Sequence, residues 1–398
     1  MIKKIFIKAM ILSFCILTIL GMSLFASARD FKWPRLIKIA TPGTQSGGFA
    51  STNGWGAKFG NALDLQLRVV PVDSEVRRYV RFTAGREFDL NSVTVADSTY
   101  AIQGEVGYAD KRAYPFRAVW HQSDTPWSIV VRGNSKFKTI YDLKQKGVRV
   151  ALAIGQPAMV TAVKEVLPAF IGWTKEEAEK NWIFVPVSSY AENCRSVTEG
   201  KADAAWGATI SSVFNEMEAH PAKIRWLDMP LADKDSWQRM LKASPTVIPA
   251  KIDLGVPSSI GVEALTSNFI YWSRADADQE MVYQIARWLH QHFDDYKDTH
   301  PLNKRMELKY FRNYLNHACL PVAEGTVRYL KEIGQWSAKD EKWNNAAIAL
   351  MDRWVSARNA ALDEAKAKGV DIHWEDKEYL AILKKHTKDI PVFTSRLD

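Results

Sequence analysis

The sequence predicts an α/β fold of two similar lobes, with crossover strands between them and a long C-terminal helix. Short apolar strands alternate with glycine loops and helices, an order typical of parallel sheets. The same helix-ending and helix-starting residues occur twice at an offset of 115 positions, which relates Ser74 to Ser189 and Gly85 to Gly200. Toward the C-terminus, apolar residues recur at helical spacing up to Gly369. We therefore expect two lobes of related design and a helical extension.

Residues 1–28 have the build of a secretory signal. Three lysines lie near the start, no charged residue lies between Ala9 and Ala28, and the stretch ends in Ala26-Ser27-Ala28. An uncleaved membrane anchor is the alternative, since about 20 apolar residues can span a bilayer. We expect cleavage after Ala28, which would place the protein in the periplasm, away from ATP, NAD and genomic DNA.

The composition is that of a globular protein and argues against a nucleic-acid binder. The formal net charge is +8, and acidic and basic residues are interspersed without a basic stripe. A modest positive balance suits the capture of anions, and it suits a solvated surface equally well. Cys194 and Cys319 could form a disulfide in an oxidising compartment, but two buried thiols are the favoured interpretation.

The first lobe is expected to comprise residues 29–126 and 256–336. Asp73 or Ser74 should begin its second helix, and Gly85 should end it. The first helix follows a loop of turn-forming residues and runs to about Leu63. Strands are predicted over 36–40, 67–72 and 92–95.

The second lobe is expected to comprise residues 127–255. Ser189 should begin one of its helices, in a capping box with Glu192. Another helix is predicted over 161–167, and strands are predicted over 148–154, 184–187 and 202–206. Crossings between the lobes are predicted over 127–131 and near 252–260, after which a helix over 278–293 belongs to the first lobe again.

A C-terminal extension, residues 337–398, is expected to hold one long amphipathic helix. Its apolar positions include Trp343, Leu350, Trp354 and Leu362, and Gly369 is the expected C-cap. A helix with one apolar face packs on its own domain or on a partner, and the first interpretation is favoured.

A ligand site is predicted where the two lobes face each other. In open α/β sheets, ligands bind at the carboxyl ends of strands, where helix N-termini offer free N–H groups to anions. Each hydroxyl side chain there could instead be a helix cap, and Arg77 could lie on a solvated helix face. The candidate ligand-binding residues are Thr44, Gly47, Gly48, Ser74, Arg77, Gln156, Pro157, Ala158, Thr161, Tyr190 and Asn193.

The sequence predicts neither catalysis nor a metal or organic cofactor. It lacks the G-x-S-x-G and H-E-x-x-H motifs. His290 and His292 lie two residues apart on an expected helix, where their side chains point in different directions. An exported enzyme that uses the same cleft is the rival interpretation, and Cys194 is its candidate nucleophile.

Six stretches follow one another along residues 37–336. They are Ile37-Lys38-Ile39-Ala40-Thr41 with Gly47-Gly48, Val72-Asp73-Ser74-Glu75-Val76, Asp142-Leu143-Lys144, Gly155-Gln156-Pro157-Ala158, Gly200-Lys201-Ala202-Asp203, and the run from Gly325 to Gly334. In this order they resemble the TAXI-type solute receptors of TRAP transporters.

The resemblance implies a periplasmic-binding-protein fold of type II-like design that closes on a small organic anion, such as a carboxylate or the amino acid glutamate. It implies delivery to the membrane permease of a TRAP transporter, with binding by the first glycine loop, Ser74 and the 155–161 loop. A receptor for an ABC importer or a sensor is the alternative. Two departures stand out: Ala158-Met159-Val160-Thr161 replaces a G-S-G-T run of the family, and Asp97 adds an acid that could repel a carboxylate.

Overall fold

A computed structural model describes residues 31–396 of the chain. The predicted secretory signal, residues 1–28, lies outside the described residues. The chain divides into two units, Met1–Pro34 and Arg35–Asp398, and the following concerns the second unit only. Among the described residues, no helix is both long and apolar enough for a membrane span.

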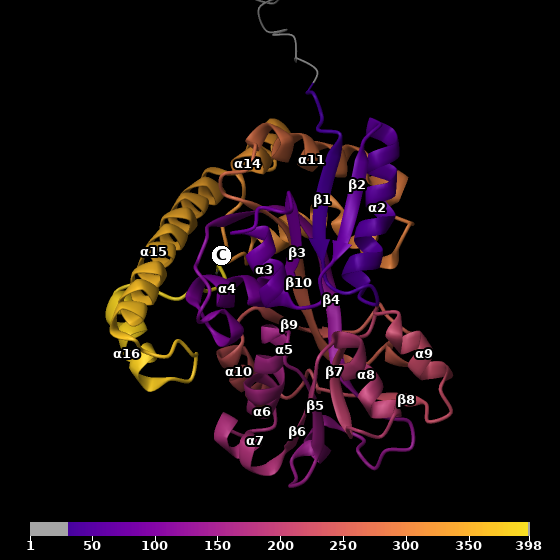
Figure 1. Cartoon of the computed structure of the whole chain (residues 1–398). Helices are drawn as coiled ribbons and strands as arrows, with labels where there is room; N and C mark the ends of the chain where they lie inside the picture. The colour runs from indigo at the N-terminus through magenta and orange to yellow at the C-terminus, as the bar shows by residue number, and fades with distance from the viewer. Residues whose placement is uncertain (1–30, 397–398) are drawn as a thin grey trace, which may run out of the picture. The chain divides into compact units, whose positions relative to one another are not determined.

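One sheet of ten strands organises residues 35–396. In chain order its strands are β1 (Leu36–Thr41), β2 (Gln66–Pro71), β3 (Leu90–Thr94), β4 (Phe116–Arg132), β5 (Arg149–Ala153), β6 (Ile183–Val187), β7 (Ala204–Ala208), β8 (Ile224–Leu227), β9 (Val247–Lys251) and β10 (Glu263–Arg274). Across the sheet they run β2-β1-β3-β10-β4-β7-β5-β6, with β8 beside β4 and β9 beside β10 (Figure 1). The pairs β1–β2, β1–β3, β5–β6 and β5–β7 are parallel, as the α/β prediction requires.

The antiparallel strands β4 and β10 connect the two halves of the sheet, which we call the lobes. The first half of β4 and the second half of β10 lie in lobe one, where β10 pairs with β3. The second half of β4 pairs with β7 and β8, and the first half of β10 pairs with β9, in lobe two. A register shift between Phe269 and Ile270 marks the change from one lobe to the other.

The position of the second crossing corrects one sequence prediction. Residues 252–260 form a loop with a short 3₁₀ turn, η4 (Pro257–Ser259), rather than a connecting strand. Gly255 and Pro257 lie in this loop after β9, and the crossing is made by the next strand, β10. The first crossing, predicted over 127–131, lies within β4. The exact lobe limits given above stay a prediction.

Helices cover both halves of the sheet, and most begin at a side-chain cap. Ser74 and Ser189 accept the expected N-cap hydrogen bonds, although the Glu192 carboxylate bonds to the N–H of Ser188 instead of completing a capping box. In lobe one the helices are α2 (Gly47–Leu63), α3 (Glu75–Phe82), α4 (Val95–Gln103), α11 (Gln279–Gln291), α12 (Phe293–Tyr296), α13 (Leu308–Leu315) and α14 (Glu324–Glu332). In lobe two they are α5 (Pro157–Thr161), α6 (Leu167–Phe170), α7 (Lys175–Asn181), α8 (Tyr190–Thr198), α9 (Val213–Ala219) and α10 (Lys234–Ala243), with a π-helical turn between α5 and α6.

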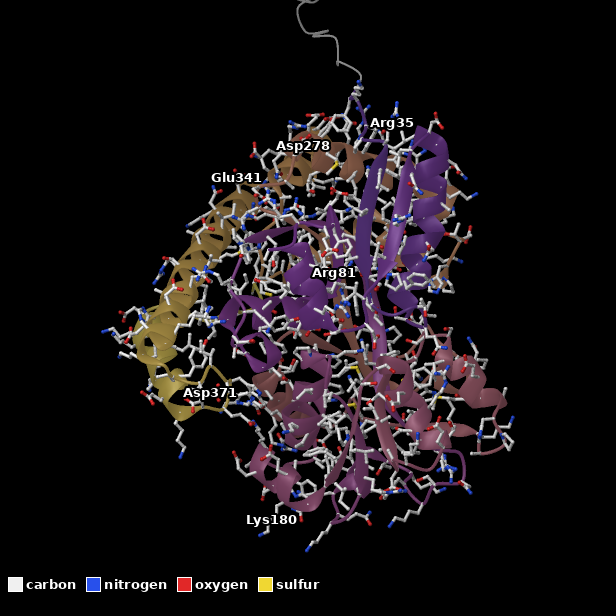
Figure 2. The ribbon with its side chains drawn as sticks, in the orientation of Figure 1. Arg35, Arg81, Lys180, Asp278, Glu341 and Asp371 are labelled. Atoms are coloured by element: carbon white, nitrogen blue, oxygen red, sulfur yellow. The ribbon has the colours of Figure 1, made fainter. Side chains whose placement is uncertain are left out.

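The C-terminal extension is an arm of two helices, α15 (Ala338–Lys368) and α16 (Lys377–Thr387). Gly369 ends α15 with φ of +68°, the left-handed conformation predicted for this C-cap. Figure 2 shows Glu341 and Asp371 at opposite ends of α15. Arg358 anchors the arm to its own domain: the fully buried guanidinium donates to the carbonyl oxygens of Tyr108 and Ala109, each at 3.1 Å. The arm therefore packs on the lobe-one segment that follows α4.

Candidate functional site

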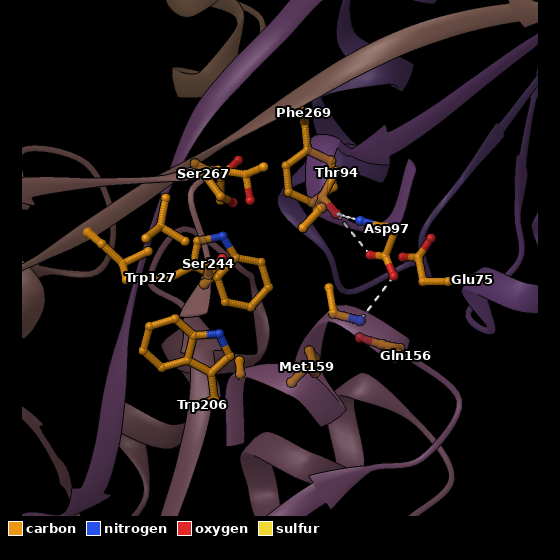
Figure 3. A pocket seen from close by; sticks show the side chains of 18 of the residues that line it. Glu75, Thr94, Asp97, Trp127, Gln156, Met159, Trp206, Ser244, Ser267 and Phe269 are labelled. Atoms are coloured by element: carbon orange, nitrogen blue, oxygen red, sulfur yellow. Dashed lines mark hydrogen bonds between the residues drawn. The ribbon is translucent and has the colours of Figure 1, made fainter. Parts of the chain in front are cut away.

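A cavity of about 100 Å³ lies between the two lobes. Roughly 10–15 Å³ of such space holds one water molecule, so this cavity has room for a small solute. Helix N-termini of both lobes and the crossing strands β4 and β10 supply its walls (Figure 3). Its larger apolar and aromatic side chains are Tyr100, Trp127, Met159, Leu167, Tyr190, Trp206, Met240, Leu265 and Phe269.

One wall of the cavity is aromatic. Trp127 on β4 and Trp206 on β7 are stacked, with ring centroids 5.9 Å apart and planes inclined by 14°. Tyr190, the first residue of α8, meets Trp127 edge to face at 6.3 Å. The two indoles are neighbours because Trp206 pairs with Ile129, two positions along β4 from Trp127. This wall offers extended π surface to a solute.

The opposite wall carries a buried carboxylate. Figure 3 shows Thr94, Asp97 and Glu75 across the cavity from the two indoles. Asp97 lies in the first turn of α4 and is 2 % exposed. Its carboxylate accepts hydrogen bonds from the Thr94 hydroxyl at 2.9 Å and from the Ala158 N–H at 3.0 Å. Burial outweighs these bonds and the charge of Arg78, and it raises the pKa of Asp97 to about 6.

Arg78, a buried cation close to this wall, does not line the cavity. Arg78 is fully buried on α3, and it forms an ion pair with Glu75. Its guanidinium also donates to the Val72 carbonyl oxygen at 2.5 Å and to Asn91 Oδ1 at 3.1 Å. Burial lowers the pKa of Arg78 to about 10, which leaves it charged at neutral pH. No lysine, arginine or histidine is among the described residues that line the cavity.

Lobe-one carboxylates hold the N-termini of lobe-two helices. Asp97 binds the N–H of Ala158 at the start of α5, and Asp73 accepts the N–H of Tyr190 at the start of α8 at 3.1 Å. We call Asp73 and Asp97 the clasp carboxylates. The Glu75 N–H donates to the Gly155 carbonyl oxygen at 3.1 Å, a further bond between the lobes. These contacts show that the lobes are closed on each other.

Five of the eleven predicted site residues line this cavity. Gly47 and Gly48 begin α2, and Gln156 and Ala158 lie at the start of α5. Tyr190 belongs to the aromatic wall, and its hydroxyl meets Ser211 Oγ at 2.9 Å. The loops that the sequence predicts to face each other therefore do so. Their roles in binding stay a prediction.

The other six predicted residues lie outside the cavity wall. Thr44 and Arg77 are exposed, and Ser74 caps α3 by accepting the N–H of Arg77. Asn193 is buried and donates to the Trp206 carbonyl oxygen at 2.9 Å, so it supports the aromatic wall from behind. The remaining two, Pro157 and Thr161, are buried within α5.

Sequence reasoning found Tyr190 but missed the other aromatic residues of the cavity, Trp127, Trp206 and Phe269. Trp127 and Trp206 lie in short apolar runs that are typical of buried strands, and nothing in such a run distinguishes a core side chain from a cavity side chain. Phe269 lies on β10, whose crossing position the sequence placed too early. Asp97 was the one member of the opposite wall with a usable signal, because it is an acid at the end of a predicted strand.

The cysteines and histidines of residues 31–396 lie outside the cavity wall. Cys194 and Cys319 are free and buried, as predicted, and burial raises the pKa of each thiol to about 12. His290 meets the Tyr329 hydroxyl at 2.6 Å and His292 meets Asp295 at 2.8 Å. No cluster of three or more potential metal ligands occurs in this described range.

Comparisons with known proteins identify a family model and solved structures that are similar to this chain. The sequence model of the NMT1-like family matches residues 77–334. No curated protein matches the chain. Among solved structures, PhnD1 of Prochlorococcus marinus with methylphosphonate is 11 % identical with a TM-score of 0.44, covering 76 % of this chain and 100 % of its own. The alkanesulfonate-binding protein SsuA of Xanthomonas axonopodis, bound to MOPS, is 12 % identical with a TM-score of 0.38, covering 92 % of this chain and 87 % of its own.

Proposed function

Since the chain belongs to the NMT1-like family, we propose that it is a solute receptor that encloses one small molecule between its two lobes. The observation that carries this proposal is the cavity itself. It lies where the carboxyl ends of the strands and the N-termini of α2, α5 and α8 converge, and two crossing strands connect its walls. A closed cavity of this kind buries most of a solute's surface, as binding sites do.

The mechanism would be hinge closure. Within residues 35–396, the chain passes between the two lobes through β4 and β10, so the register shift beside Phe269 is where we expect the backbone to bend. A solute that contacts both walls binds the closed form better than the open form, and the closed population then rises by mass action. The clasp carboxylates would stabilise the same closed form.

We propose binding rather than catalysis at this site. A nucleophile needs a positioned base or a lowered pKa. The buried thiol of Cys194, whose pKa is raised, has the opposite property. The aromatic wall and the clasp carboxylates suit recognition of a solute.

The resemblance to TAXI-type receptors supports delivery to a TRAP-type membrane permease from the periplasm. An ABC importer is the alternative partner. The two differ in energy source, because a TRAP permease uses an ion gradient and an ABC importer uses ATP. Uptake by vesicles that contain the candidate permease, with an ion gradient and without ATP, would separate them.

Native mass spectrometry and one close-packed glycine test the receptor function. A small adduct that is lost on denaturation would support enclosure of a solute. A Cβ on Gly47 would lie 2.9 Å from Ile210 Cγ2, in the lobe-two loop after β7, and 2.9 Å from Leu302 Cδ1. We therefore expect Gly47→Val to prevent full closure and to weaken solute binding at least tenfold, as measured by calorimetry.

Gly369→Ala is the matched control, because a Cβ there meets nothing within 4 Å and the residue ends α15 far along the chain. It should bind as the unmodified protein does. Equal binding by Gly47→Val and Gly369→Ala would contradict closure around this cavity.

A further inference from the structure

The charges around the cavity are unsuited to an anion. Its wall holds two acids, Glu75 and Asp97, and no basic side chain among the described residues. The charge of Glu75 is compensated by an ion pair with Arg78, which does not line the cavity. That leaves Asp97 as the carboxylate without a salt-bridge partner there, since its partners are the Thr94 hydroxyl and the Ala158 N–H. A solute carboxylate would meet this charge in a poorly hydrated space, where like charges repel strongly.

At three helix starts beside the cavity, an acceptor of the protein itself takes one N–H group. Free N–H groups at helix starts are the usual anion donors of such clefts. Here the start of α5 is bound by Asp97, and the start of α8 is bound by Asp73. In lobe one, Ser46 accepts the N–H of Phe49 at the start of α2. The protein therefore supplies its own acceptor for one N–H at each of these helix starts, and both lobe-two starts receive a carboxylate.

The aromatic wall completes the pattern. Trp127, Trp206 and Phe269 line the cavity and present ring faces and edges, with Tyr190 beside the indoles. Ring faces carry negative electrostatic potential, and tryptophan is the strongest of them toward a cation. With aromatic surface on one side and a buried carboxylate on the other, the cavity favours a solute that carries a positive charge on an apolar body.

Resting on the proposed receptor function, we infer that the enclosed solute is a small protonated amine with an apolar or aromatic body, and not the carboxylate that the family resemblance implies. The ammonium group would lie toward Asp97, and the body would lie against Trp127 and Trp206. The size of the cavity, about 100 Å³, suits a solute of roughly one substituted ring.

A matched set of ligands tests this assignment. Benzylamine, benzyl alcohol and benzoate share one ring and differ in charge at pH 7.5, and glutamate represents the ligand implied by the resemblance. The full chain is unfolded and refolded to remove any carried solute, and binding is followed by tryptophan fluorescence and calorimetry. We expect benzylamine to bind at least tenfold more tightly than benzoate or glutamate, with benzyl alcohol between them.

Asp97→Asn separates charge from shape. The amide has nearly the size of the carboxylate, and its oxygen can still accept the N–H of Ala158. The variant should lose most of the preference for benzylamine over benzyl alcohol and keep the binding of benzyl alcohol. Asp363→Asn, at an exposed acid of α15 paired with Arg112, is the control and should keep the preference of the unmodified protein.

Each outcome decides between the two proposals. Tighter or equal binding of benzoate or glutamate would overturn the amine assignment and leave the receptor function standing. If none of the four binds, the gently purified protein is examined by native mass spectrometry. An acidic adduct would overturn the amine assignment, a basic adduct would support it, and the absence of any adduct would contradict the receptor function itself.

Discussion

Replacing Asp97 by asparagine should stabilise the protein at alkaline pH, which is the reverse of what most substitutions of buried polar residues do. The pKa of this carboxyl is raised from 3.8 to about 6 in the folded chain, chiefly by burial. Above pH 6 the Asp97 carboxyl is ionised in both the folded and the unfolded chain, and in the folded chain this charge is buried at a cost in free energy. A difference of about two pKa units corresponds to ~3 kcal/mol of unfolding free energy.

The sign follows from proton binding. Between pH 4 and 6 the folded chain holds the Asp97 proton while the unfolded chain releases it, so stability falls as the pH rises through this window. Asparagine has no charge and removes the effect. Removing the charge by Asp97→Asn should therefore raise the unfolding free energy by ~3 kcal/mol at pH 8 and by about 1 kcal/mol at pH 4.5. The lost hydrogen bond from Thr94 lowers the unfolding free energy by about 1 kcal/mol at both pH values.

Urea unfolding of the refolded, solute-free protein at these two pH values measures the difference. The informative quantity is the pH dependence, because the lost hydrogen bond lowers stability equally at both. A gain that is larger at pH 8 by about 2 kcal/mol would support the reasoning. A change of the same size at both pH values, or a loss confined to pH 8, would refute a buried charge at Asp97.

Two further predictions concern other parts of the chain. Arg358→Met should lower the unfolding free energy, measured by urea titration, by about 3 kcal/mol, because it leaves carbonyl oxygens of the segment after α4 without their donor. Arg353→Met, at an exposed arginine of the same helix, should change the unfolding free energy by less than about 0.5 kcal/mol in the same titration. Cys194 and Cys319 should not react with a thiol reagent in the folded protein at pH 8 and should both react in urea, since burial raises the pKa of each to about 12; rapid labelling of either thiol under native conditions would contradict this.

Local signals explain what the sequence could predict. Ser74, Ser189 and Gly369 hold the capping positions expected of them, because a cap depends on residues within one helical turn. The strand and helix order of both lobes follows for the same reason. The α/β architecture is therefore available from short-range patterns alone.

The missed features depend on long-range pairing. The second crossing is predicted near 252–260 because prolines and a glycine break helices there, whereas the crossing strand of the structure is β10, which pairs with β4. Asp73 and Ser74 were both candidates for the N-cap of α3. Ser74 is the N-cap, and Asp73 instead accepts the N–H of Tyr190, 117 positions away. The charge of the cavity wall depends on such pairings, which short-range patterns in the sequence do not show.

The place of β10 in the sheet also affects how the chain can be assembled. β10 lies between β3 and β4, so lobe one lacks its central strand until all of lobe two has been made. At ~5–20 residues per second, β10 follows β3 by roughly 10–35 seconds of synthesis. During that interval the edges of β3 and of the first half of β4 are unpaired and open to wrong partners. The strand that joins the lobes in the finished protein is therefore the last strand of the sheet to be synthesised, and lobe one cannot complete its sheet before then.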